Sequence, residues 1–515
     1  MKRISILNHV LGPVMRGPSS SHTAGAHRIG VLARALFGGP PRSVAVAFDA
    51  QGSFGQVYRE QGADLAFAAG VMGWPIIDER FRSALDEAAA CDLHVSFEVR
   101  DLPEADHPNT MLVELAGERR LSLRLVARST GGGAIEITRL GPWPVRLTGT
   151  TYECCVEVAN AGVARVLELL TQGVRVERTD RVPQGEVTLV TASRLEALAD
   201  DAKEAIARSA GVRGAWFAEP VFFLQRGEAL FSGAAEMVSL AENQGFSLGQ
   251  AALYYEAALL GLSPARVLEE MGQRLDVMQA AVSAGLGTDP PGMQLLRPSA
   301  GKIMAAEAKR SLPLGGIHAR IAARAMAVMH TNGGMGVVCA APTAGSAGVL
   351  PAIAATLREE IGLSREGVAL ALLAGGVVGV IVGERATFAA EVAGCQVEIG
   401  AAGAMGAAMV VDASGGSASQ AADAAAIAFQ NTMGSVCDLV QGIVEVPCHT
   451  RNAVAASAAF LCADLVMGGY ENPVPLDETI DAVYAVGRML PSELRCTARG
   501  GLAVTPSALA MPRLR

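Results

Sequence analysis

The feature that most constrains this chain is a stretch from residue 391 to residue 453 that carries three cysteines in turn-like settings. Cys395 stands in Glu391-Val-Ala-Gly-Cys-Gln-Val-Glu-Ile-Gly400, Cys437 in Gly434-Ser-Val-Cys-Asp438, and Cys448 in Val444-Glu-Val-Pro-Cys-His-Thr-Arg-Asn452. Glycine or proline beside each cysteine predicts an element end or a turn, where a sulfur can point into a cavity. Thiolates placed this way suit a soft metal or an iron–sulfur cluster.

Three buried structural cysteines are the alternative interpretation, because free cysteine packs as a small hydrophobe. The separations of 42 and 11 residues match no compact zinc or ferredoxin spacing. Spacing alone therefore leaves both interpretations open.

Length and composition set the general class of the protein. The chain has 515 residues, enough for about three domains of roughly 150 residues each. Half of the residues are hydrophobic but only 4% are aromatic, and 58 are glycines, which predicts alanine-rich helices with small-residue packing and many tight turns. A net charge of −9 without a basic run argues against a nucleic-acid partner, so small soluble partners are expected.

Three further features predict a cytoplasmic protein with no membrane partner. The first ten residues lack the apolar core of roughly 7–15 residues that a signal peptide has. Nine cysteines in a chain of this size favour reduced thiols, metal ligation or catalysis over a disulfide framework. The uncharged run from Gly367 to Gly383 is shorter than the ~20 residues of a membrane span, and we interpret it as a buried core helix.

Hydrophobic periodicity predicts a multidomain α+β protein. Residues 1–145 form an N-terminal α/β lobe, with a strand over 43–48 and a helix over 24–37. Residues 146–208 are expected to form a module of order βαββα. Residues 209–515 are expected to form an all-α catalytic domain, with helices over 247–260, 263–282, 299–311, 317–330 and 420–432.

Two polar turns lie in the first domain. Gly17-Pro-Ser-Ser-Ser-His-Thr23 precedes the helix at residue 24, so its hydroxyls at a positive helix end suit a carboxylate. The alternative is an ordinary helix cap. Asp106-His-Pro-Asn109 is the second turn, where proline biases His107 to an extended backbone, and a plain surface turn is its alternative.

Further segments complete a pattern that resembles a known family. They are Asn332-x-x-Met335-Gly336, Ala341-Pro-Thr-Ala-Gly-Ser-Ala-Gly348 and Thr497-Ala-Arg-Gly-Gly-Leu-Ala-Val-Thr-Pro506. With the three cysteine segments they resemble the α region of the iron–sulfur L-serine dehydratases (L-serine ammonia-lyases), and the 17–23 turn resembles the β-region signature of the same enzymes. The chain is thus identified as a divergent member with β and α regions fused.

The resemblance implies a 4Fe-4S cluster held by Cys395, Cys437 and Cys448, with one open iron that acts as a Lewis acid on the β-hydroxyl of L-serine. β-Elimination would yield pyruvate and ammonia. A homodimer acting on a small amino acid is expected. The residues implied to bind substrate are Ser19, Ser20, Ser21, Thr23, Asn109, Thr343, Ala344, Gly345, Ser346 and Arg451.

The chain departs from the family where the base is expected. The family usually carries Gly-His-Gly-Thr-Asp, whereas this chain has Arg59-Glu-Gln-Gly-Ala-Asp64, and Gln61 cannot accept a proton at neutral pH. His22 and His107 are our catalytic candidates; the others are His449 and Glu60. The tail, residues 511–515, lacks the cysteine with which some members cap their cluster, so such self-inhibition is not predicted.

Two features bear on regulation and cofactor. Residues 146–208 resemble an ACT-like regulatory module, but its usual Asp-x-Pro-Gly ligand turn is Ala159-Asn-Ala-Gly162 here, which favours a structural or dimerising role. The same reaction also runs on pyridoxal phosphate, which needs a catalytic lysine near a glycine-rich phosphate loop. Lys302 is the one lysine in such a setting; we expect a helix-start charge there and no pyridoxal phosphate.

Three functions remain open at this point. The first is cluster-dependent dehydration of L-serine. The second is a cluster-dependent lyase acting on another β-substituted amino acid or β-hydroxy acid, such as cysteine desulfidation, and Gln61 favours it. The third is a non-catalytic iron–sulfur sensor, which intact cysteines without the family's base would fit.

Overall fold

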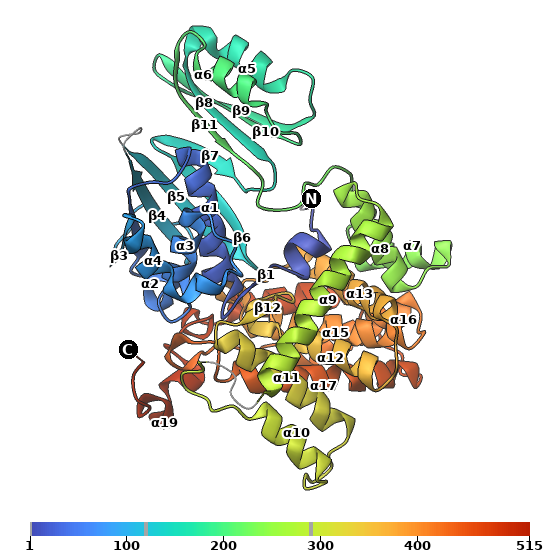
Figure 1. Cartoon of the computed structure of the whole chain (residues 1–515). Coiled ribbons are helices and arrows are strands. Elements are labelled where there is room, and N and C mark those ends of the chain that lie inside the picture. The colour runs from blue at the N-terminus through green and yellow to red at the C-terminus, as the bar shows by residue number, and fades with distance from the viewer. Residues whose placement is uncertain (1–2, 118–121, 288–291, 515) are drawn as a thin grey trace. The chain divides into compact units, whose positions relative to one another are not determined.

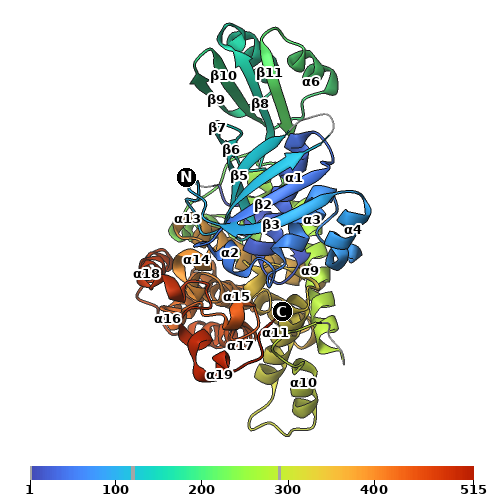
Figure 2. The same ribbon diagram turned by 90° about the vertical axis from the view of Figure 1, so that its left-hand side faces the viewer.

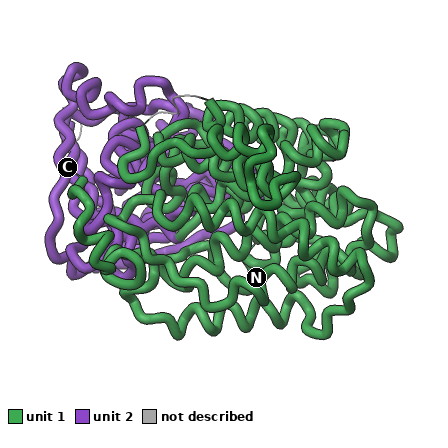
Figure 3. Tube along the Cα trace, turned by 90° about the horizontal axis from the view of Figure 1, so that it is seen from below, with its two compact units in different colours: residues 1–24, 131–133, 227–515 green, residues 25–130, 134–226 purple. Residues whose placement is uncertain are grey.

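The computed structural model describes residues 3–117, 122–287 and 292–514. It divides into two compact units (Figure 3). The helical unit comprises residues 1–24, 131–133 and 227–515, and the sheet unit comprises residues 25–130 and 134–226. Helices and several sheets occur together, so the predicted α+β class is confirmed.

The sheet unit contains a six-stranded sheet and the helices that accompany it. Their bounds are α1 Gly25–Phe37, β2 Ser43–Asp49, α2 Ser53–Val57, α3 Ala63–Met72, η3 Glu79–Ser83, α4 Ala84–Ala90, β3 His94–Arg100, β4 Thr110–Ala116, β5 Leu123–Gly131, β6 Ala134–Leu140 and β7 Trp143–Leu147. The strand order is β3-β2-β4-β5-β6-β7, with β2 parallel to β3 and antiparallel to β4 (Figure 2). Val44, Val46 and Phe48 lie two residues apart on β2 and enter one core with Ile29 of α1 and Phe67 of α3.

A second, four-stranded sheet follows in the same unit. Its elements are β8 Tyr152–Ala159, η4 Asn160–Gly162, α5 Val163–Thr171, β9 Val176–Gln184, β10 Val187–Arg194, α6 Asp200–Ala207 and β11 Val212–Ala218. The order β11-β8-β10-β9 with antiparallel pairs is the split βαβ arrangement. The predicted βαββα order therefore lacks the last strand, β11. This strand was missed because the register shift between Val212 and Gly214 interrupts its alternation of side chains.

The helical unit is built mainly from the C-terminal half of the chain (Figure 1). Its helices are α7 Ala234–Gln244, α8 Leu248–Leu260, α9 Pro264–Leu286, α10 Ala300–Ala308, α11 Ile317–Gly333, α12 Val349–Glu359, α13 Arg365–Arg385, α14 Ala390–Ala393, α15 Ile399–Ala413, α16 Ala418–Thr432, α17 Cys448–Met467, α18 Leu476–Met489 and α19 Pro506–Leu509. The five helices predicted between residues 247 and 432 are confirmed by α8, α9, α10, α11 and α16.

The first 24 residues belong to the helical unit. This N-terminal segment contains η1 Ile6–Val10, β1 Val14–Arg16 and η2 Ser20–Ala24. β1 pairs antiparallel with β12, Val337–Cys339, so strands occur among residues 209–515 and the all-α expectation for them is wrong in this detail. Contacts across more than 300 residues decide where this segment folds, and local periodicity cannot reveal them.

Glu256 of α8 anchors the N-terminal segment. Its buried carboxylate accepts hydrogen bonds from the hydroxyl of Ser5 and from the backbone N–H groups of Ile6, at 2.8 Å, and Leu7, at 2.9 Å. Arg274 of α9 donates from Nε to the carbonyl of Leu11, at 2.7 Å. These two charged side chains satisfy both ends of η1.

Glycines of α13 let the N-terminal segment and α15 approach closely. A Cβ on Gly376 would lie 2.6 Å from Ile6, and one on Gly375 would lie 2.8 Å from the Met405 carbonyl oxygen. α13 is long and apolar enough to cross a membrane by composition, yet 83% of its most apolar window is buried inside the protein. The interpretation of the 367–383 run as a buried core helix is thereby confirmed.

We predict that Glu256→Ala detaches the N-terminal segment. Two backbone N–H groups would stay buried without an acceptor, at about 1–3 kcal/mol each, so the urea midpoint should fall and proteases should cleave before residue 25. Glu242→Ala, an exposed glutamate on α7, is the matched control. An unchanged midpoint and cleavage pattern for Glu256→Ala would contradict this role.

Candidate active site

The three predicted cysteines lie at element ends or in a loop, as the glycine or proline within three residues of each indicated. Cys395 begins η6, Cys395–Val397, directly after Gly394, whose φ of +75° ends α14. Cys437 lies in the loop that follows α16, and Cys448 is the first residue of α17. All three are buried.

Two backbone connections hold the Cys395 and Cys437 loops together. The Cys395 N–H donates to the Ser435 carbonyl at 3.0 Å, and the Gly434 N–H donates to the side-chain oxygen of Gln396 at 2.8 Å. A Cβ on Gly394 would lie 2.8 Å from the same Ser435 oxygen, so only glycine permits this approach. The two sulfurs are thereby brought to one place.

The thiols form a connected group. Cys395 is hydrogen-bonded to Cys437, and Cys437 is also hydrogen-bonded to Cys496, which the sequence analysis did not select. Cys448 lies close enough that the charge of Cys395 acts on it. The hydrogen bond from Cys437 and burial raise the pKa of Cys395, and burial raises the pKa of Cys448, so both are neutral thiols at physiological pH when no metal is bound.

Asp438, beside Cys437, connects three segments. One carboxylate oxygen accepts from Arg451 of α17 at 3.0 Å, and the other accepts from the Leu502 N–H at 2.8 Å. Arg451 also donates to the Val436 carbonyl at 2.8 Å. Arg451, predicted to bind substrate, therefore at least positions the loop that carries Cys437.

The serine-rich turn of the N-terminal segment lies in the same unit. Ser21 Oγ donates to Glu391 Oε1 at 2.9 Å and lies 2.9 Å from His22 Nδ1, which is 3.9 Å from the same carboxylate oxygen. Ser19 lies 3.3 Å from Ser21, and Thr23 accepts from the Ser19 N–H. The turn thus does more than cap a helix, because its side chains reach a glutamate 370 residues away.

The predicted 343–346 segment also reaches this turn. The Ala344 N–H donates to Ser20 Oγ at 3.4 Å. Asn452 of α17 donates to the Gly345 carbonyl at 2.8 Å and accepts from the Gly348 N–H at 3.0 Å. The hydroxyl of Ser346 donates to the Ala341 carbonyl and so supports the turn from inside.

Two carboxylates near the thiols were missed, those of the buried Glu391 and the partly exposed Glu398. Thr343 hydrogen-bonds Glu398, and desolvation together with the neighbouring charge of Glu391 raises the pKa of Glu398 to about 8. Below that pH Glu398 is protonated and can donate a hydrogen bond, whereas Glu391 accepts from Ser21. The available signal was their position on either side of Cys395 within an otherwise apolar run.

His449 lies beside Cys448 but packs against another imidazole. Its ring centroid is 5.3 Å from that of His330, and both side chains are buried. Burial and the charge of His330 lower the pKa of His449 to about 3, so it stays neutral. This makes His449 a poor candidate for the proton acceptor.

The remaining predicted site residues belong to the sheet unit. His107 Nδ1 accepts from the Asn109 N–H at 3.1 Å, within the turn that precedes β4, and the Asn109 side chain donates to the Ser129 carbonyl at 3.5 Å. Gln61 is buried beside the start of α3. Their part in the site stays a prediction.

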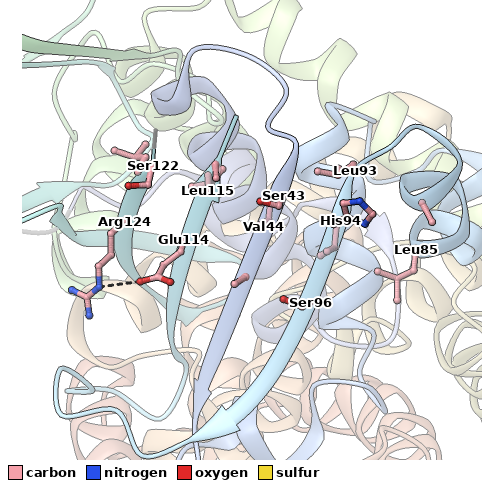
Figure 4. A pocket seen from close by; sticks show the side chains of 15 residues that line it. Ser43, Val44, Leu85, Leu93, His94, Ser96, Glu114, Leu115, Ser122 and Arg124 are labelled. Carbon is pink, nitrogen blue, oxygen red and sulfur yellow. Dashed lines mark ion pairs between the residues drawn. The ribbon is translucent and has the colours of Figure 1, made fainter. Parts of the chain in front are cut away.

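The sheet unit and the helical unit each contain a cavity. One of about 720 Å³ in the sheet unit is lined by strands β2 to β5, where Arg124 pairs with Glu114 at 3.6 Å (Figure 4). Its described lining contains no cysteine. The other, of about 480 Å³, lies among α15, α16 and α17 and reaches Cys395 and Arg451, which makes it the cavity connected to the thiols.

The donor set fits an iron–sulfur cluster better than a single ion. Among the described residues, no three His, Cys, Asp or Glu side chains surround one ion position. The buried thiols of Cys395 and Cys437, which are hydrogen-bonded to each other, instead suit a multinuclear cluster, whose soft irons prefer thiolates. Because the metal-free thiols are neutral, loading a cluster must release protons.

Similar proteins identify the family to which this chain belongs. The family model described as serine dehydratase alpha chain matches residues 191–503, more than half of the chain. The chain belongs to the serine dehydratase family. This family member is 35% identical over 278 residues to the probable L-serine dehydratase alpha chain of Bacillus subtilis, covering 54% of this chain and 93% of the relative.

Two further relatives show how the family member is assembled. It is 39% identical over 197 residues to the probable L-serine dehydratase beta chain of Bacillus subtilis, covering 37% of this chain and 87% of that one. It is 31% identical over 281 residues to L-serine dehydratase 1 of Escherichia coli, covering 53% of this chain and 62% of that one. The predicted fusion of β and α regions is therefore confirmed.

We predict that Gly17→Ala displaces the serine-rich turn. A Cβ there would overlap the carbonyl and side-chain oxygens of Asn332, whose amide donates to the Pro18 carbonyl at 2.9 Å. Hydrogen exchange of residues 18–24 should become faster. Gly403→Ala is the control, because its Cβ would meet its nearest neighbour at an ordinary 3.7 Å; equal exchange in both variants would refute the prediction.

Proposed function

We propose that this protein is an L-serine ammonia-lyase that eliminates the β-hydroxyl of L-serine and yields pyruvate and ammonia. The observation that carries the proposal is the group of buried thiols in the same compact unit as a serine-rich turn and the carboxylates of Glu391 and Glu398. Relatives named L-serine dehydratase support the choice of substrate.

In this proposal Cys395, Cys437 and Cys448 hold a 4Fe-4S cluster. When bound, the cluster supplies a Lewis-acidic open iron that makes hydroxide a viable leaving group. The protein contributes the position of the sulfurs, through the Cys395–Ser435 backbone bond and the Asp438–Arg451 pair. The guanidinium of Arg451 also lies near the sulfurs and offsets their negative charge.

His22 is the base that we assign to the α-proton. Ser21 Oγ donates its proton to Glu391, so it accepts from His22 Nδ1–H. This order of hydrogen bonds assigns the neutral tautomer whose basic lone pair is on Nε2. Glu391 orients the imidazole through Ser21 and stabilises the imidazolium that forms.

The substrate carboxylate is assigned to the hydroxyls of Ser19, Ser20 and Thr23 on the serine-rich turn and of Thr343. Ser21 lies on the same turn but donates its proton to Glu391. The contact of Ser20 with the Ala344 N–H joins the turn to residues 344–346. Neutral donors in a buried place select a small anionic group.

The βαββαβ module is assigned an ACT-like fold with a structural, dimerising role. Asn160, in the turn where such modules hold their ligand, donates to the Gly185 carbonyl at 2.9 Å and accepts from Thr188 at 2.8 Å. Its amide is thus used within the module. Because the amide is used in this way, we propose that no amino acid binds at this turn to regulate the enzyme. We also propose that the protein is a cytoplasmic homodimer.

The experiment that tests the function is anaerobic reconstitution followed by a 2-oxo acid assay with L-serine, L-threonine and L-cysteine. Pyruvate from serine supports the proposal. Sulfide from cysteine without serine turnover would support the second candidate, a cysteine desulfidase, which Gln61 favours. No turnover with any of these substrates would favour the third function, a non-catalytic iron–sulfur sensor.

The same preparations test the ligands. The variants Cys395→Ala, Cys437→Ala and Cys448→Ala should each lose the brown absorbance, bound iron and activity. In the proposal each of these thiolates is a ligand of the 4Fe-4S cluster, and two remaining thiolates would not hold it. Cys91→Ala, an exposed cysteine in the sheet unit, is the control. A full complement of iron in any of the three variants removes that residue from the ligand set.

The base has its own test. We expect His22→Asn to lower kcat by about 10²–10⁴-fold with the iron content unchanged, the usual contribution of general base catalysis. Gln61→His is the companion variant; if His22 already acts as base, its serine turnover should equal that of the wild type. A large gain from Gln61→His with little loss from His22→Asn would move the base to position 61.

A further inference from the structure

A fourth cysteine lies among the three that the family pattern supplies. Cys496 stands between η8, Ser492–Leu494, and η9, Gly501–Val504. Its thiol is hydrogen-bonded to that of Cys437, which in turn is hydrogen-bonded to Cys395. Cys496 forms no disulfide and is half-buried, unlike the three buried predicted ligands.

Backbone hydrogen bonds fix this contact on both sides of Cys437. The Cys437 N–H donates to the Leu494 carbonyl at 2.8 Å, and the Cys496 N–H donates to the Cys437 carbonyl at 2.9 Å. Cys437 and Arg495 accordingly form a parallel β-bridge. The pairing does not depend on the thiols, so it would persist if either sulfur were removed.

Two further features fix the backbone of the loop that carries Cys496 beside Cys437. Its φ of +58° is a left-handed backbone conformation that a non-glycine residue adopts only when its surroundings require it. The Leu502 N–H donates to Asp438 at 2.8 Å and so holds the far end of the 496–502 loop beside Cys437. Gly501 permits this, because a Cβ there would overlap the Asp438 carboxylate.

We infer that Cys496 is a fourth protein thiolate for the cluster and ligates the iron that Cys395, Cys437 and Cys448 leave open. The inference rests on the proposed function, because that function supplies the cluster. Four cysteines are the common complete ligand set of a 4Fe-4S cluster. Before any metal is bound, Cys437 is hydrogen-bonded to both Cys395 and Cys496, and the charge of Cys395 acts on Cys448. The chain thus carries an internal fourth ligand although its tail, residues 511–515, has no cysteine.

A fourth thiolate has a consequence for substrate entry. With a cluster bound, Cys496 would have to leave its iron before an oxygen of the substrate could take that position, an exchange of one ligand for another without oxidation or reduction. The released thiolate would take a proton from water. Cys496 is a partly exposed residue, whereas Cys395, Cys437 and Cys448 are buried.

Iron loss is the first test. Reconstituted wild type, Cys496→Ser and the control Cys91→Ser are oxidised with ferricyanide and followed by electron paramagnetic resonance and iron analysis. We expect Cys496→Ser to lose one iron per chain and to develop the signal of a three-iron cluster, whereas the wild type and the control keep four irons. Equal three-iron signals in all three proteins would overturn the inference.

Alkylation of the wild type provides a test that needs no variant. Cluster-loaded protein is treated anaerobically with iodoacetamide, with and without L-serine, and modified cysteines are located by mass spectrometry. Cys496 should be protected without substrate and modified when L-serine is present; modification at the same rate in both conditions would refute its ligation. Iron retained after alanine substitution of Cys395, Cys437 or Cys448 would instead count against the proposed cluster itself.

Discussion

The loop that carries Cys437 is the constraint on which the rest of the candidate site depends. It receives the Cys395 N–H at Ser435, the Arg451 guanidinium at Val436 and Asp438, and the Leu502 N–H at Asp438. Hydrogen bonds from Cys395, Arg451 and Leu502 therefore meet on Ser435, Val436 and Asp438. Backbone atoms and a partly buried ion pair thus fix the loop that carries Cys437.

The long-range placement of the N-terminal segment is the second constraint. Glu256 and Arg274 satisfy the backbone of η1, and β1 pairs with β12, so the serine-rich turn is delivered to the helical unit before the chain enters the sheet unit. Glycines of α13 make the required space. The chain contains regions similar to two Bacillus subtilis relatives, which are separate chains named alpha and beta.

Local sequence signals predicted a good part of this arrangement. Glycine and proline beside Cys395, Cys437 and Cys448 indicated element ends, and apolar periodicity located α8, α9, α11 and α16. The pairing of Ser21 with Glu391 and the contact of Cys496 with Cys437 could not be predicted from local sequence, since each joins residues tens to hundreds of positions apart. The raised pKa of Glu398 depends mainly on its desolvation in the fold. The extra strand β11 was missed because a glycine interrupts its alternation.

A ligand role and a purely structural role for the buried cysteines differ in where iron binds. The most direct measurement is an iron-edge anomalous difference map from crystals grown without oxygen after reconstitution. We predict one compact iron peak bounded by the sulfurs of Cys395, Cys437 and Cys448. Iron bound elsewhere, or no iron beside these sulfurs in protein that is fully active on L-serine, would contradict the central claim.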